Sequence, residues 1–292
     1  MAMKTVRRRW WIPFGVLCVV ASSRWIVADQ WPRMGSTLRS EAWACAIGAV
    51  AACAVAIARR RQAPRLWDVL GTLAVGGGLL AAPALGAALR GPAGEPLIRT
   101  VALCFVPVVV ILLSGILTGQ RTSLWPGLAG LGGALLVLPL TLPSDVLGWV
   151  WLIAPPVAVS VACVACRKVA RLVAVEWSAS LLFAGGAVGL VLIEAGRVAS
   201  SGVSAQSFSL WGMALDALLT GLVVLVVLQM DGLRYAARYF AIPLLTIVET
   251  ALIVRSGVTL RLCAGMVLLA AGAVGLLRAR GGDDEISSLH LV

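Results

Sequence analysis

Charged side chains are scarce in this sequence. Aspartate, glutamate, lysine and arginine make up 13% of its 292 residues, whereas 60% of the residues are hydrophobic and the mean hydropathy is +0.98. A soluble domain is typically about a quarter charged and about half apolar. Because no water-soluble fold buries so large an apolar fraction, the composition predicts a protein whose solvent is the lipid bilayer.

Histidine is almost missing, since the single histidine, His290, falls in the C-terminal tail. An intramembrane zinc protease needs an H-E-x-x-H helix, and a serine protease of the usual kind needs a histidine base within a span, so both are excluded. An aspartyl protease needs two paired aspartates in the membrane, and Asp216 stands alone there. We therefore expect no enzyme activity and no catalytic residue.

Clustered metal ligands are also lacking. The seven cysteines all fall inside apolar segments, and the C-x-x-C pair of Cys163 and Cys166 has neither a second pair nor a histidine cluster to accompany it. Such a pair alone does not complete a metal site. We interpret the cysteines as small buried hydrophobic residues, and we expect no metal and no cofactor.

Long apolar runs take the place of the missing charge. In lipid every backbone polar group must be paired internally, which leaves helix bundles and closed barrels. Barrel strands alternate apolar and polar residues, whereas residues 222–228 are apolar on all sides, so the sequence predicts an all-α membrane protein. A span needs about 20 apolar residues, and about ten transmembrane helices are expected on that basis. Their ranges are 10–28, 42–58, 67–89, 96–118, 123–141, 145–166, 176–197, 208–230, 235–254 and 259–278.

The net charge of +11 comes from short arginine clusters between the apolar runs. This pattern indicates topology signals and not a nucleic-acid partner. With the N-terminus in the cytoplasm, Lys and Arg on the cytoplasmic side outnumber those on the other side by roughly two to one. Residues 1–11 are basic, as in a signal peptide, but no small-residue cleavage site closes the apolar stretch that follows. We expect a retained first helix in a multi-pass inner-membrane protein with both termini cytoplasmic.

Two segments repeat a pattern. Pro107 begins an apolar run that ends in a short turn and Ser123, and Pro243 begins a similar run that reaches Thr259 at the same spacing. With five spans in each half, the second half enters the membrane inverted relative to the first, which suits alternating access. The expected division is into a first five-helix repeat, 1–142, a second five-helix repeat, 143–280, and a cytoplasmic tail, 281–292.

These segments, 107–136 and 243–277, resemble the drug/metabolite transporter superfamily in its ten-helix EamA-type branch. The resemblance is carried by Pro243, the turn Arg255-Ser256-Gly257, Thr259 and Gly265. The chain departs from the family pattern in having Gln120 and Ser256 where a glutamate is usual. The resemblance implies a secondary carrier of small metabolites, often amino acids or amphipathic compounds, that commonly exports them through a central cavity lined by both repeats.

Ionisable side chains within spans are costly and mark function or interior pairing. Asp216 lies near the middle of the eighth span, Glu249 in the ninth and Arg24 near the end of the first. Helical spacing places Tyr235, Tyr239, Thr246 and Glu249 on one stripe of the ninth span and pairs Asp216 with Thr220 on the eighth. If the two stripes face each other, they form a polar track through the bundle. The alternatives are an interior polar clamp and, for Arg24, a side chain that snorkels to the interface. The expected substrate-binding or proton-binding residues are Arg24, Asp216, Thr220, Tyr239, Thr246 and Glu249.

Three further expectations concern packing. Gly185 and Gly189 form a G-x-x-x-G pattern that favours close helix contact. Glu194 and Arg197 are spaced for a local ion pair. The adjacent prolines 155 and 156 are expected to break the sixth helix.

The function expected from these features is secondary transport of a small molecule by a monomer or homodimer in the bilayer. A flippase for lipids or lipid carriers with the same fold is the closest alternative, because an apolar interior suits a greasy substrate. A non-transporting sensor or assembly factor is the third possibility.

Overall fold

The described chain consists of helices and turns, without a strand. The computed structural model describes residues 10–24, 26, 37–88, 96–118, 123–137, 146–201, 210–253 and 259–279. The first half contains α1 (Trp11–Ser22), α3 (Leu38–Ala58), α4 (Leu66–Gly76), α5 (Pro96–Leu103), α6 (Val106–Thr118) and α7 (Trp125–Val137). The second half contains α8 (Val146–Leu172), α9 (Val175–Ser201), α10 (Leu210–Gln229), α11 (Gly232–Ala236), α12 (Arg238–Ile253) and α13 (Leu260–Arg278). A π-helical turn, η4 (Gly77–Ala81), and a 3-10 segment, η5 (Ala82–Ala88), extend α4.

The prediction of an all-α membrane protein is confirmed. Eight helical segments of 19–25 residues are long and apolar enough to cross a membrane, as a bilayer core of about 30 Å requires. Each of them coincides with one of the predicted spans. The remaining two predicted spans, 10–28 and 123–141, contain the shorter apolar helices α1 and α7, of 12 and 13 residues.

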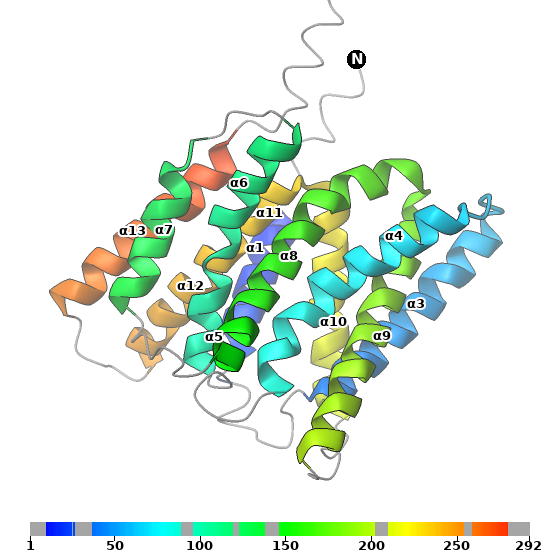
Figure 1. Ribbon diagram of the computed structural model, residues 1–292, viewed down its shortest axis with the longest axis horizontal. Helices are drawn as coiled ribbons and strands as arrows, with labels where there is room; N and C mark the ends of the chain where they lie inside the picture. The colour runs from blue at the N-terminus through cyan, green and yellow to red at the C-terminus, as the bar shows by residue number, and fades with distance from the viewer. Residues whose placement is uncertain are drawn as a thin grey trace, which may run out of the picture.

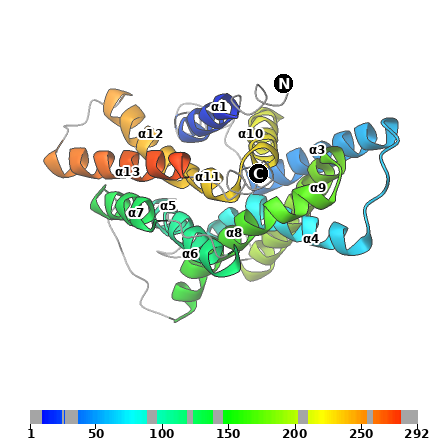
Figure 2. The ribbon, with the colours of Figure 1, turned by 90° about the horizontal axis from the view of Figure 1, so that it is seen from above.

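The helices run side by side in one bundle (Figure 1). Seen from above, the pair α7 and α13 lies on one side and the pair α3 and α9 on the other, with α1, α8, α10 and α11 between them (Figure 2). In the middle of the bundle α1 packs against α10 and α12, and α8 packs against α4 and α6.

The beginning of α1 and the end of α13 lie at the same end of the bundle. The Arg234 guanidinium lies 5.9 Å from the centre of the Trp10 ring, just before α1. The same side chain donates a 3.1 Å hydrogen bond to the Ala279 carbonyl, just after α13. The opposite end of the bundle contains the end of α1 and the beginnings of α3 and α10.

Glycines allow the closest helix contacts, as the G-x-x-x-G pattern predicted. A Cβ on Gly185 of α9 would overlap the Leu73 carbonyl, and a Cβ on Gly76 of α4 would overlap the Leu182 carbonyl. The contact between α7 and α13 is built in the same way, with Gly133 against the Gly265 carbonyl. In lipid, where apolar surface alone does not hold helices together, such close backbone contact supplies much of the packing energy.

Gly185→Ala is therefore expected to lower the thermal stability of the purified protein in detergent. Forcing extra atoms into a packed contact typically costs about 1–3 kcal/mol. Gly196→Ala, on the same helix but with open space around its Cα, is the matched control and is expected to be neutral or stabilising, since alanine favours helix by roughly 1 kcal/mol. The midpoints of heat-induced loss of monodisperse protein test this, and equal midpoints would contradict it.

The predicted break at prolines 155 and 156 is wrong, because α8 continues through both. Proline removes a backbone donor, but hydroxyls and neighbouring helices can satisfy the freed groups in a membrane bundle. The buried Ser160 hydroxyl lies 2.6 Å from the Pro156 carbonyl and 3.3 Å from the Val106 carbonyl, which ties α8 to the start of α6. The packing of α8 against α4 and α6 supports a continuous helix at the position where a break was expected.

Breaks occur instead in two other spans. The fourth span is interrupted between α5 and α6, at Cys104 and Phe105, just before Pro107. The ninth is interrupted at Ala237, between α11 and α12, six residues before Pro243. The two interruptions touch, since the Cys104 thiol lies 3.3 Å from the Tyr239 carbonyl.

Candidate functional site

A partly buried ion pair joins the segment that follows α1 to α10. Arg24 Nη2 lies 2.6 Å from Asp216 Oδ1, and the Ser40 hydroxyl of α3 donates a 2.6 Å hydrogen bond to Asp216 Oδ2. The Asp216 side chain has no exposed surface, whereas the Arg24 side chain is 35% exposed. Both oxygens of this buried carboxylate are therefore bonded to groups from other helices.

The neighbouring residues of α1 bind a second carboxylate. The Ser22 and Ser23 hydroxyls lie 2.7 Å and 3.0 Å from Glu249 Oε1 on α12. Arg24 also lies 4.0 Å from a carboxylate oxygen of Glu41 on α3. The end of α1 thus contacts three acidic side chains. We refer to the set Ser22, Ser23, Arg24, Ser40, Glu41, Asp216 and Glu249 as the acidic network.

Local sequence explains how Ser40 is positioned. Thr37 is the N-cap of α3, and its side chain accepts a 3.0 Å hydrogen bond from the Ser40 backbone N–H. In return the Ser40 hydroxyl oxygen accepts a 2.9 Å hydrogen bond from the Thr37 N–H. This capping box fixes the Ser40 side chain, so that its hydroxyl lies within hydrogen-bonding distance of Asp216.

Of the six predicted site residues, Arg24 and Asp216 are in direct contact, and Glu249 joins them through the serines of α1. Thr220 and Thr246 instead donate to carbonyls of their own helices, those of Asp216 and Ile242. The stripes of α10 and α12 do not face each other directly in the described residues, because α1 packs against both helices and lies between the two carboxylates. Spacing along a helix predicts which residues share one of its faces, but it does not predict which other helix packs against that face.

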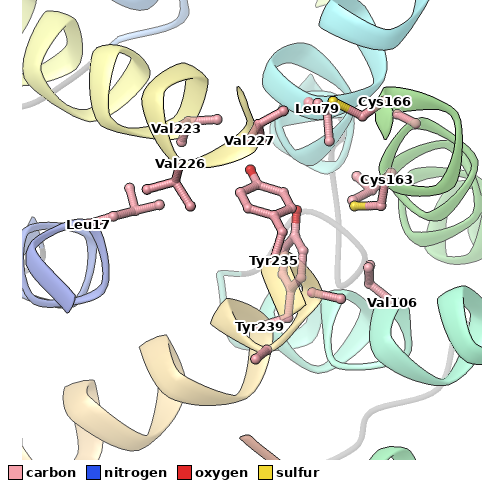
Figure 3. Packing of buried hydrophobic residues seen from close by; sticks show 14 of the residues in the cluster. Leu17, Leu79, Val106, Cys163, Cys166, Val223, Val226, Val227, Tyr235 and Tyr239 are labelled. Atoms are coloured by element: carbon pink, nitrogen blue, oxygen red, sulfur yellow. The ribbon is translucent and has the colours of Figure 1, made fainter. Parts of the chain in front are cut away.

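Tyr239 belongs to a separate cluster with Tyr235, which shares its predicted stripe, and with Arg238, which was not among the predicted site residues. Its hydroxyl accepts a hydrogen bond from Arg238, and the Arg238 guanidinium carbon lies 4.3 Å and 4.6 Å from the ring centres of Tyr235 and Tyr239. All three side chains are buried. Figure 3 shows Tyr235 between Val227 of α10 and Cys163 of α8. Arg238 lies inside the predicted span 235–254, but an arginine so close to the start of a span ordinarily indicates the cytoplasmic interface.

Ion pairs also lie outside these two clusters. Glu194 and Arg197 form the predicted local pair, with N–O distances of 2.8 Å and 3.0 Å. Arg59 and Arg61 both contact Glu176 where α3 ends and α9 begins. Within the described residues, no group of three or more His, Cys, Asp or Glu side chains is arranged to hold a metal ion.

Comparison with known proteins identifies a fold and no activity. The sequence matches no protein-family model and none of the curated proteins compared with it. A solved structure described as "Crystal structure of protein" superimposes with a TM-score of 0.68 at 20% identity, over 93% of this chain and 99% of that chain. At this identity the likeness shows that the two chains share a fold along nearly their whole lengths.

Proposed function

We propose that this protein is a secondary transporter of small metabolites, amino-acid-like or amphipathic, which works by alternating access and exports its substrate. In this proposal it is a ten-helix member of the drug/metabolite transporter superfamily, of the EamA type. The first repeat comprises α1, α3, α4 with its extension, α5–α6 and α7. The second comprises α8, α9, α10, α11–α12 and α13.

The pattern of helix contacts supports two inverted repeats. In the proposed repeats α1 corresponds to α8, α3 to α9, α4 to α10, α5–α6 to α11–α12 and α7 to α13. If each helix is exchanged for its counterpart, the contacting pairs α3–α9 and α7–α13 stay the same. The contact of α4 with α9 maps onto that of α10 with α3, and the contact of α1 with α12 maps onto that of α8 with α6. Each of these pairs is packed together. The interrupted span α5–α6 likewise has the interrupted span α11–α12 as its counterpart.

The acidic network is the observation that carries the transport proposal. Arg24 and the two serines belong to the first repeat, and Asp216 and Glu249 belong to the second. Buried ionisable groups are expensive in a membrane and are retained for function or pairing. Here they link the two repeats at one end of the bundle, so opening that end requires these contacts to break. A solute or proton that competes for the carboxylates would couple binding to this opening.

The topology that accompanies the proposal places both termini in the cytoplasm of a cell with an inner membrane. The shared end of Trp10, Arg234 and Ala279 supports termini on one side, and the excess of arginine supports the cytoplasm as that side. The acidic network then closes the outward-facing end.

Reconstitution into proteoliposomes tests the transport function. Charge movement and uptake are measured on addition of single amino acids and amphipathic amines, with Asp216→Asn and Glu249→Gln beside the unaltered protein. We expect at least one solute to be carried, with both variants reduced by about tenfold or more, since each loses an interaction worth about 1.5–3 kcal/mol. If both variants take up solute at the same rate as the unaltered protein, the acidic network has no role in transport.

A flippase for lipids is the second candidate. A groove of about 700 Å³ lies between α3 and α9, and its lining is apolar apart from Arg39 and Glu194. An apolar groove with an exposed arginine at its edge suits a lipid whose headgroup is anionic. Movement of fluorescent lipid between leaflets of the same vesicles, without movement of any soluble compound, would favour this function over solute transport.

A further inference from the structure

The interior of the bundle contains a cation without an acidic partner. Arg238 begins α12 and is 6% exposed. Within the described part of the chain, the groups that face its charge are Tyr235, Tyr239, Cys18 and Cys163, and none of these has a carboxylate. The salt bridges of the described residues use other arginines. A buried charge in a membrane protein is normally paired, so Arg238 differs from Arg24, Arg197 and Arg234.

Two buried donors at this position lack acceptors. Arg238 Nε and the Tyr235 hydroxyl are both buried and have no hydrogen-bond partner in the described residues. The tyrosine rings stabilise the guanidinium through their faces, but a ring face satisfies neither the Nε–H nor a hydroxyl. Leaving buried donors unpaired is costly, and the two donors flank the same positive charge.

The place of Arg238 in the fold is that of a transporter binding site. It follows directly after the interruption between α11 and α12, and the interruption between α5 and α6 contacts it through Cys104 and the Tyr239 carbonyl. Interrupted helices in corresponding positions of two inverted repeats mark the usual location of substrate sites. The cluster also contacts α8 and α10 of the second half and α1 and α6 of the first, so helices from both halves surround it.

We propose that Arg238 and Tyr235 bind the oxyanion, a carboxylate or a phosphate, of the transported solute. One oxygen accepts from Arg238 Nε and another from the Tyr235 hydroxyl, while Tyr239 orients the guanidinium through the hydrogen bond from Nη2. A guanidinium N–H forms a strong, directional, charge-assisted hydrogen bond with an oxyanion oxygen. The inference rests on the proposed transport function and adds that the substrate is an anion or a zwitterion.

The chain offers a selective probe, because its only two tyrosines are Tyr235 and Tyr239. Protein labelled with 3-fluorotyrosine will give two fluorine NMR signals, both from this cluster, which Tyr235→Phe and Tyr239→Phe assign. In nanodiscs of neutral lipid, the signals are followed during titration with benzoate, phenyl phosphate and the neutral analogue benzamide. We expect saturable shifts with benzoate or phenyl phosphate, and none with benzamide. The anion that binds more tightly identifies carboxylate or phosphate as the natural group.

The variants separate binding from a purely structural role. Tyr235→Phe removes a hydroxyl that has no hydrogen-bond partner within the described residues, so it is expected to leave thermal stability unchanged or improved. It is also expected to weaken anion binding, followed through the Tyr239 signal, by about tenfold. Arg238→Lys keeps the positive charge but lacks the fixed, planar N–H donors of the guanidinium, and it is expected to weaken anion binding further. Arg234→Gln, beside Trp10, is the control and leaves binding unchanged.

Three results would overturn the inference. These are no shift with either anion, equal binding by Tyr235→Phe and unaltered protein, and shifts produced only when anionic lipid is added to the nanodiscs. The two proposals fail separately. Anion binding without transport of any solute would overturn the proposed transport function but not the proposed anion-binding site. Transport that is unaffected by Tyr235→Phe and Arg238→Lys would overturn only the proposed anion-binding site.

Discussion

Arg24→Ala is expected to destabilise the protein more than Asp216→Asn, although both variants are expected to lose transport. The Asp216 side chain is fully buried against Arg24. Removing one partner of a buried ion pair typically costs about 3–5 kcal/mol, because the other charge stays buried and uncompensated. Asp216→Asn instead leaves behind an arginine that is 35% exposed and can extend its head to water. Asp216→Asn is therefore expected to lower the free energy of unfolding by about 1–3 kcal/mol, the typical cost of losing a hydrogen-bond partner. Unfolding midpoints and solute uptake measure the two effects.

Two further variants make this comparison decisive. Arg39→Ala removes an exposed arginine from α3 near the same end of the bundle and is expected to change stability little. The exchange Arg24→Asp with Asp216→Arg restores opposite charges and is expected to recover part of the stability and transport lost by either single change. Equal losses for Arg24→Ala and Arg39→Ala would show that the pair with Asp216 does not stabilise the bundle.

The positions of the helices were predictable from sequence because each is a run of apolar residues about as long as the bilayer is thick. The ends were less predictable. The predicted span 145–166 belongs to an α8 that continues to Leu172, because arginines beyond the apolar run still favour helix. The predicted break at prolines 155 and 156 was wrong because α8 packs against α4 and α6, and spacing along one helix does not reveal such packing.

For the candidate site, individual acidic residues could be predicted from the sequence, but their contacts could not. Asp216 and Glu249 are conspicuous because they are acids in apolar runs. Their partners are not, since Ser22 and Ser23 resemble any serines at the end of a helix, and 226 residues separate Ser23 from Glu249. Arg238 shows the opposite failure. An arginine at the start of a span is usually solvated at the interface, and only the packing of α8, α10 and α12 around it shows that it is buried.

Breaking the acidic network is expected to expose Cys45 to water-soluble thiol reagents. Cys45 lies on α3 one turn after Glu41 and is fully buried. If the network closes this end of the bundle, Arg24→Ala shifts the protein toward the open arrangement. A change of 1.4 kcal/mol in that equilibrium is tenfold, so the rate of modification of Cys45 by a charged methanethiosulfonate is expected to rise by about tenfold or more. The measurement uses a protein in which Cys45 is the only remaining cysteine.

Cys53 provides the matched control for this experiment. It lies two turns further along the same helix, is half-buried and is outside the acidic network. Its modification rate in a single-cysteine protein is expected to be unchanged by Arg24→Ala. A similar rise at both cysteines would mean that the variant loosens the whole bundle, and no rise at Cys45 would mean that the network does not control access to this end. A rise at Cys45 alone would be the result that alternating access requires, because it separates opening of one end from loss of the fold.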